Sequence, residues 1–179
     1  MTKPYYLALI LGAALFTLTA CQDGTTGQSA GQAKAPVLTN VDIAFINRAG
    51  PSGLGEVAFA SLAQTKATDP AIRDLATKMI AEFSALNLQL ATLAQSNELA
   101  PATDMDGRHQ VVYHQLESLN KGAFDRAYIN GQLQDLTMVI QAFQTEADSG
   151  SQPQVRSVAQ QHLPTLLQDL QMANKIGNQ

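Results

Sequence analysis

The sequence has no tryptophan and only one cysteine among its 179 residues. A single thiol excludes an internal disulfide. Clustered basic residues interleaved with aromatic side chains are also missing, and the formal net charge is −4, so nucleic-acid binding is not expected. Runs of β-branched residues are scarce, whereas alanine and glutamine are plentiful, and this balance favours helices. The hydrophobic content of 45% is sufficient for a core packed through leucine, alanine and methionine.

The usual catalytic loops are missing as well. No Gly-x-Ser-x-Gly nucleophile elbow occurs in the sequence. The glycine-rich segment 50–55 lacks the lysine and the preceding strand of a phosphate-binding loop. We therefore predict no catalytic residue, no cofactor and no enzymatic activity.

The N-terminal residues have the pattern of a secretory signal peptide. Lys3 precedes an apolar run over residues 5–18, which is shorter than the roughly 20 apolar residues of a membrane-spanning helix. The run leads into the tetrapeptide LTAC, which ends at Cys21 and resembles the lipobox of bacterial lipoproteins. This resemblance implies cleavage before Cys21 and acylation of that residue, which would anchor the protein in a membrane. A plain secretory signal with an incidental cysteine is the alternative.

The residues after Cys21 indicate a location and a tether. Gln22 follows the cysteine, which favours the outer membrane by analogy with the enterobacterial sorting rule. Residues 22–36 carry no large apolar side chain, as is typical of a flexible linker. We divide the chain into a signal peptide (1–20), a lipidated cysteine with its tether (21–37) and a folded domain (38–179). The predicted partners are the membrane and an unidentified envelope protein.

Apolar residues recur at spacings of three and four along four segments, as on one face of a helix. The most regular segment is 124–147, where Asp125 is placed to cap the first turn. A second segment runs from about residue 39 to 67, and Pro51 is expected to bend or break it. The other two cover residues 70–96, with Asp69 as the cap, and 153–175, with Pro164 as a kink.

Residues 101–123 connect the second and third of these segments. Val111, Val112 and Leu116 indicate one short helix within the connection. Residues 70–76 resemble residues 153–159, and each copy begins a helix that follows another amphipathic helix. Two helical hairpins joined by a crossover make a four-helix bundle. The predicted fold is an all-α, up-down four-helix bundle of the ferritin-like type, with a short extra helix in the long crossover.

Three short motifs carry a resemblance to a known family. They are FDRAY at 124–128, LPTL at 163–166 and GLGEV at 53–57. Together they resemble a bacterial domain family of unknown function, described as outer-membrane or periplasmic proteins with a ferritin-like bundle. The resemblance covers about residues 39–176. It implies a fold and an envelope location, and no established activity.

The histidines do not form the usual pattern of a ferritin-like metal site. Such sites use a Glu-x-x-His motif on two helices, and none of His109, His114 and His162 follows a glutamate by three positions. The pair Asp106 and His109 is the nearest match, and we expect it to be an exposed pair in the crossover. The sequence therefore predicts no metal ligands.

The family resemblance leads to the same expectation. Its members often carry histidine where this chain has Phe83, Leu136 and Asp169. The resemblance implies that imidazoles able to bind a transition metal are replaced here by two apolar groups and one carboxylate.

Three polar residues remain on the apolar faces of the predicted helices. Glu56 lies on the first helix, and His162 and Asp169 lie on the last. Because a buried charge needs a partner, we hypothesise that Glu56 meets His162 or Asp169 in the core as a buried polar cluster. The alternative is that Pro164 and the segment around Gly53 rotate these side chains to the surface.

Taken together, these features predict a non-catalytic envelope lipoprotein that acts as an interaction or structural module on the periplasmic side of a membrane. One alternative is a ferritin-like protein that stores or oxidises a transition metal. Another is a small-ligand binder with a pocket near the crossover, where helical bundles open.

Overall fold

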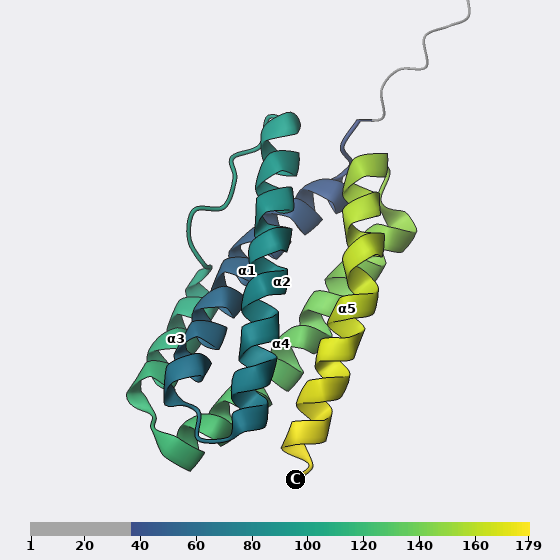
Figure 1. Ribbon diagram of the computed structural model, residues 1–179. Helices are drawn as coiled ribbons and strands as arrows, with labels where there is room; N and C mark the ends of the chain where they lie inside the picture. The colour runs from purple at the N-terminus through teal and green to yellow at the C-terminus, as the bar shows by residue number, and fades with distance from the viewer. Residues whose placement is uncertain (1–36) are drawn as a thin grey trace, which may run out of the picture. The chain divides into compact units, whose positions relative to one another are not determined.

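The computed structural model describes residues 37–179, which form five helices and no strand (Figure 1). The helices are α1 (Asn40–Lys66), α2 (Pro70–Ser96), α3 (Gly107–Ser118), α4 (Lys121–Ser149) and α5 (Pro153–Gly177). None of them is long and apolar enough to cross a membrane. The predicted signal peptide, Cys21 and the tether up to residue 36 lie outside the described residues.

Four of the helices pack as two hairpins, α1 with α2 and α4 with α5. The hairpins close into a bundle because α1 also packs against α4, and α2 against α5. The crossover after α2 returns the chain to the end at which α2 begins, so α2 and α4 run in the same direction (Figure 1). The predicted all-α four-helix bundle, with a short helix in its second connection, is confirmed.

The core is formed by the apolar faces that the sequence pattern identifies. In α2 these side chains are buried without a polar interruption, and they are Ile72, Leu75, Ala76, Met79, Phe83, Leu86, Leu90 and Ala94. Each large apolar side chain contributes about 1.5–3 kcal/mol when it is fully buried. Phe45 of α1 and Phe143 of α4 meet edge to face, with ring centroids 4.9 Å apart.

Pro51 does not break α1, which is continuous from Asn40 to Lys66. A proline removes the amide that would bond to the carbonyl four residues earlier, here that of Asn47. Asn47 is exposed, so water can bond to this carbonyl. The continuous helix keeps Ser52 and Glu56 one turn apart on the same face.

The start of α4 differs from the prediction. The helix begins at Lys121, and Asp125 does not cap it. The Asp125 carboxylate instead accepts hydrogen bonds from the backbone amides of Thr68, at 3.0 Å, and Asp69, at 3.1 Å. Asp125 therefore ties α4 to the turn between α1 and α2, whereas Asp69 caps α2 as predicted.

The short helix α3 packs on α1 and α4 and covers one side of the bundle (Figure 1). Asp106 caps it, because its Oδ1 accepts a hydrogen bond from the His109 amide at 3.0 Å. The buried residues of α3 are His109 and Leu116. They are seven positions apart and therefore share one face of the helix.

At one end of the bundle, Asp42 of α1 joins the turn between α4 and α5. Its Oδ1 accepts hydrogen bonds from the backbone amides of Ser151 and Gln152, both at 3.0 Å. Burial opposes ionisation, but hydrogen bonds from Thr39 and Gln152 outweigh it and lower the pKa of Asp42 to about 2. Burial and the neighbouring Asp42 raise the pKa of Glu146, which is also buried, to about 7.

The raised pKa of Glu146 predicts a pH-dependent stability. The folded state binds this proton more tightly than the unfolded state, so the stabilisation is complete below about pH 4.5 and is lost as pH rises through 7. Glu146→Gln imitates the protonated form. We expect it to be near neutral at pH 5 and to raise the free energy of unfolding by about 1–2 kcal/mol at pH 8.

Urea denaturation at the two pH values measures this difference. The control is Asp148→Asn on the exposed end of α4, which should change stability little at either pH. An equal effect of Glu146→Gln at pH 5 and pH 8 would contradict the assignment.

Candidate functional site

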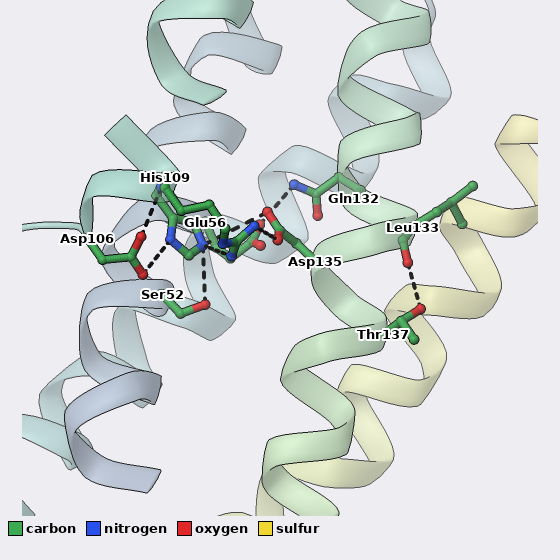
Figure 2. A network of polar contacts seen from close by, with 9 residues as sticks. Ser52, Glu56, Asp106, His109, Gln132, Leu133, Asp135 and Thr137 are labelled. Atoms are coloured by element: carbon green, nitrogen blue, oxygen red, sulfur yellow. Dashed lines mark hydrogen bonds and ion pairs between the residues drawn. The ribbon is translucent and has the colours of Figure 1, made fainter. Parts of the chain in front are cut away.

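A buried polar cluster lies where α1, α3 and α4 meet (Figure 2). Glu56 from α1, His109 from α3 and Asp135 from α4 each offer one nitrogen or oxygen atom, and these atoms all lie within 4.8 Å of one another. None of the three residues is more than 2% exposed. One imidazole and two carboxylates at this spacing form a donor set that suits a transition-metal ion.

Both ring nitrogens of His109 lie close to polar side chains (Figure 2). Nδ1 lies 2.9 Å from Asp106 Oδ2, and Nε2 lies 2.9 Å from Arg108 Nη2 and 3.3 Å from Ser52 Oγ. Arginine only donates, so Nε2 accepts and the proton lies on Nδ1, facing Asp106. Nε2 is also 3.9 Å from Asp135 Oδ2. A carboxylate behind an imidazole whose other nitrogen faces a site is the arrangement that orients metal-binding histidines.

Gly55 provides the space for the His109 ring. A Cβ atom at position 55 would lie 2.5 Å from Cδ2 of His109 and 2.7 Å from its Cγ, closer than packed atoms approach. One turn further along α1, Phe59 stacks on the imidazole with ring centroids 5.6 Å apart. The surface of α1 is therefore shaped to receive a buried histidine.

Arg108 supplies the positive charge of the cluster. Its Nη1 forms a charged hydrogen bond with Asp135 Oδ1. The Arg108 side chain is 46% exposed, whereas that of Asp135 is 3% exposed. The guanidinium thus reaches from the protein surface to a buried carboxylate.

Glu56 is the member of the cluster whose burial is least offset by hydrogen bonds. Its Oε2 accepts a hydrogen bond from Gln132 Nε2 at 2.8 Å, while its Oε1 is buried without a hydrogen-bond partner within residues 37–179. Burial and the nearby Asp135 carboxylate raise the pKa of Glu56 to about 8. The Oε1 of Gln132 is also buried without a partner in this part of the chain. A bound cation would satisfy such orphaned oxygens, so the residues present fit a metal ion.

The contacts of Asp106, His109 and Ser52 have the connectivity of a nucleophilic triad. However, Arg108 donates to His109 Nε2 at 2.9 Å, a shorter contact than the 3.3 Å to Ser52. The lone pair that would take the serine proton is therefore already engaged. Proton transfer from Ser52 to His109 would therefore first require Arg108 to move away.

Glu56, His162 and Asp169, the predicted polar cluster, bond to three different residues among those described. Glu56 bonds to Gln132, as given above. The half-buried His162 has its Nε2 3.1 Å from Gln89 Oε1, and the buried Asp169 bonds to Lys78 Nζ at 2.5 Å. Glu56 and Asp169 interact through charge alone, since Asp169 adds to the rise in the pKa of Glu56. The partners that complete the site around Glu56 come from α3 and α4.

The expectation that Asp106 and His109 form an exposed pair is wrong for His109, which is 0% exposed. The seven-residue spacing to Leu116 was the sequence signal for its burial. Asp135 was missed because it lies beside the main apolar face of α4. It belongs to a second buried row at spacings of four and three, which consists of Tyr128, Gln132, Asp135 and Val139.

Comparisons with known proteins agree with this fold. The family described as a domain of unknown function (DUF4142) matches residues 27–176. No curated protein matches the sequence. Among solved structures, the chain is similar to a DUF305 fragment from Deinococcus radiodurans, with a TM-score of 0.69 and 14% identity over 80% of this chain and 100% of that one.

A second similar structure is that of CopM in its silver-bound form. The TM-score is 0.63 and the identity 17%, over 75% of this chain and 93% of that chain. At such identities the similarity shows the fold alone, which is the ferritin-like all-α fold that the sequence predicts.

Proposed function

This chain belongs to the DUF4142 family, and we propose that it is a non-catalytic, lipid-anchored protein of the bacterial envelope whose helical bundle binds one transition-metal ion. The metal-binding part rests on the buried donor set of Glu56, His109 and Asp135 with its orphaned carboxylate oxygen. The location rests on the lipobox-like sequence that ends at Cys21 and on the tether that follows it.

The donor types narrow the range of ions. A neutral imidazole suits zinc, copper, iron and nickel, and carboxylates accept these ions as well as manganese. Within residues 37–179 three donor residues converge, so the cluster fits one ion and not the pair of ions held by ferritin-like carboxylate bundles. The silver ion in the CopM structure belongs to that protein. Its relevance is that another bundle of similar fold holds a metal.

The space beside the cluster favours an ion over an organic ligand. The cavity lined by Ser52, Asp106, Arg108, His109 and Met138, among others, has a volume of about 40 Å³. Pockets for small organic molecules typically measure roughly 300–1,000 Å³. The cavity beside the cluster is therefore too small for such a molecule.

Glu56→Gln tests the proposal with little change in shape. The amide side chain can still accept the hydrogen bond from Gln132, but it lacks the negative charge and is a poorer metal ligand. We expect the wild-type chain, purified in full and titrated with Zn²⁺ or Fe²⁺, to bind one ion, and Glu56→Gln to bind it roughly 10–100-fold more weakly.

The matched control is Glu146→Gln, which changes a buried glutamate at the other polar cluster and should leave metal affinity unchanged. Metal content after gel filtration, together with direct titration, measures binding. Equal affinity in wild type and Glu56→Gln, or no binding to the wild type, would reject the proposed metal site.

A further inference from the structure

The guanidinium of Arg108 contacts two of the three residues that would hold a metal ion. Nη2 lies 2.9 Å from His109 Nε2, and Nη1 is hydrogen-bonded to Asp135 Oδ1. A neutral imidazole nitrogen has one lone pair, so it cannot bind a metal ion while it accepts a hydrogen bond from arginine. Arginine and metal therefore compete directly for the imidazole, and the guanidinium also holds one of the two oxygens of Asp135.

We propose that Arg108 is a built-in counter-cation that leaves the cluster when a metal ion binds, and that this exchange makes the site select divalent over monovalent ions. The inference rests on the proposed function, because it concerns the same three ligands.

Arg108 is placed to leave without unfolding its surroundings. Its side chain is nearly half exposed, so the guanidinium can move into water. Asp106, whose side chain is 40% exposed, also lines the small cavity and already interacts with the charge of Arg108. A carboxylate at the rim is thus available to the displaced guanidinium. The backbone of Arg108 can stay in the first turn of α3 throughout.

The charges explain the selectivity. A monovalent ion would replace one positive charge by another and would forfeit the two hydrogen bonds that Arg108 makes with His109 and Asp135. A divalent ion brings a second positive charge, which faces Glu56, the carboxyl group with the orphaned oxygen. Silver and copper(I) also prefer sulfur ligands to carboxylates. Zn²⁺ should therefore displace Arg108 where Ag⁺ does not.

Two variants of the full chain test the competition. Arg108→Gln removes the competing charge, and we expect it to bind Zn²⁺ roughly tenfold or more tightly than wild type. Arg108→Lys keeps a cation and should stay close to wild type. Titration with Co²⁺ gives an independent spectroscopic signal of ligation by the same residues.

A measurement on the wild-type chain avoids dependence on the stability of Arg108→Gln. Phenylglyoxal modifies accessible arginines, and peptide mass spectrometry follows the rate at Arg108. We expect this rate to rise on addition of Zn²⁺ and to be unchanged with Ag⁺, while the rate at the exposed Arg48 stays constant with both ions.

The outcomes separate the two proposals. If wild type binds Zn²⁺ through Glu56 but Arg108 keeps the same reactivity, or if Arg108→Gln and wild type have equal affinity, the exchange is rejected and the metal site stands. Equal displacement of Arg108 by Ag⁺ rejects the selectivity. If neither wild type nor Arg108→Gln binds Zn²⁺ in a way that depends on Glu56, the proposed function itself fails, and the exchange with it.

Discussion

Replacing Asp42 by alanine is expected to lower the free energy of unfolding at pH 7 by about 3–4 kcal/mol, because hydrogen bonds to a charged group are worth about 1.5–3 kcal/mol each. The carboxylate is 0% exposed. One oxygen bonds to the amides of Ser151 and Gln152, and the other bonds to the amide and hydroxyl groups of Thr39. The substitution therefore loosens the start of α1 and its link to the turn between α4 and α5.

Urea denaturation followed by circular dichroism measures the change. Asp148→Ala, on an exposed acidic residue near the same end of α4, is the control and should stay within about 0.5 kcal/mol of wild type. Because the pKa of Asp42 is lowered to about 2, its contribution is present above pH 3.8 and is lost as pH falls through 2. The gap between wild type and Asp42→Ala should shrink over that interval. A constant gap would show that the charge is not what stabilises this end.

Gly55→Ala is expected to destabilise the protein by about 1–3 kcal/mol, the usual cost of overpacking a core. The added methyl group would meet the His109 ring at 2.5 Å, so the imidazole or the whole of α3 has to shift. Metal affinity should fall together with stability, since His109 Nε2 moves away from Glu56 and Asp135.

Gly131→Ala in α4 is the matched control. Apart from the neighbouring backbone of α4, no described atom lies within 4 Å of a Cβ placed there, and alanine favours a helix interior over glycine by about 1 kcal/mol. The two alanines should therefore change the free energy of unfolding in opposite directions in urea titrations. A Gly55→Ala variant as stable as Gly131→Ala would contradict the packing role of Gly55.

The helices could be predicted because their signals are local. The spacing of apolar residues in α2 and the Asp69-Pro70 pair at its start depend on nothing outside that segment. Asp125 carries the same local signal of a cap, yet it bonds to the turn at Thr68, 57 positions earlier in the chain. A cap motif does not reveal whether a tertiary partner will take the carboxylate instead.

The candidate site was only partly visible in the sequence. Glu56 stood out because it interrupts the apolar face of α1. Its partners could not be assigned, because the burial of His109 depends on the absence of a side chain at Gly55 on another helix. Pro51 leaves α1 unbroken for a related reason, since the cost of a proline in a helix depends on whether water reaches the carbonyl of Asn47. Such features depend on packing between distant segments.

Few buried side chains hold α3 to the bundle, so a metal ion bound to His109 would affect how firmly this helix is attached. This helix of 12 residues buries only two of them, His109 and Leu116, whereas α2 buries eight. A segment anchored at so few points opens more readily than the rest of the bundle. An ion bound to the imidazole would add a third point of attachment between α3 and the bundle. The fraction of molecules in which α3 is packed against the bundle would therefore rise with the ion concentration. The order of the exposed face of α3 would then depend on whether the buried site holds an ion.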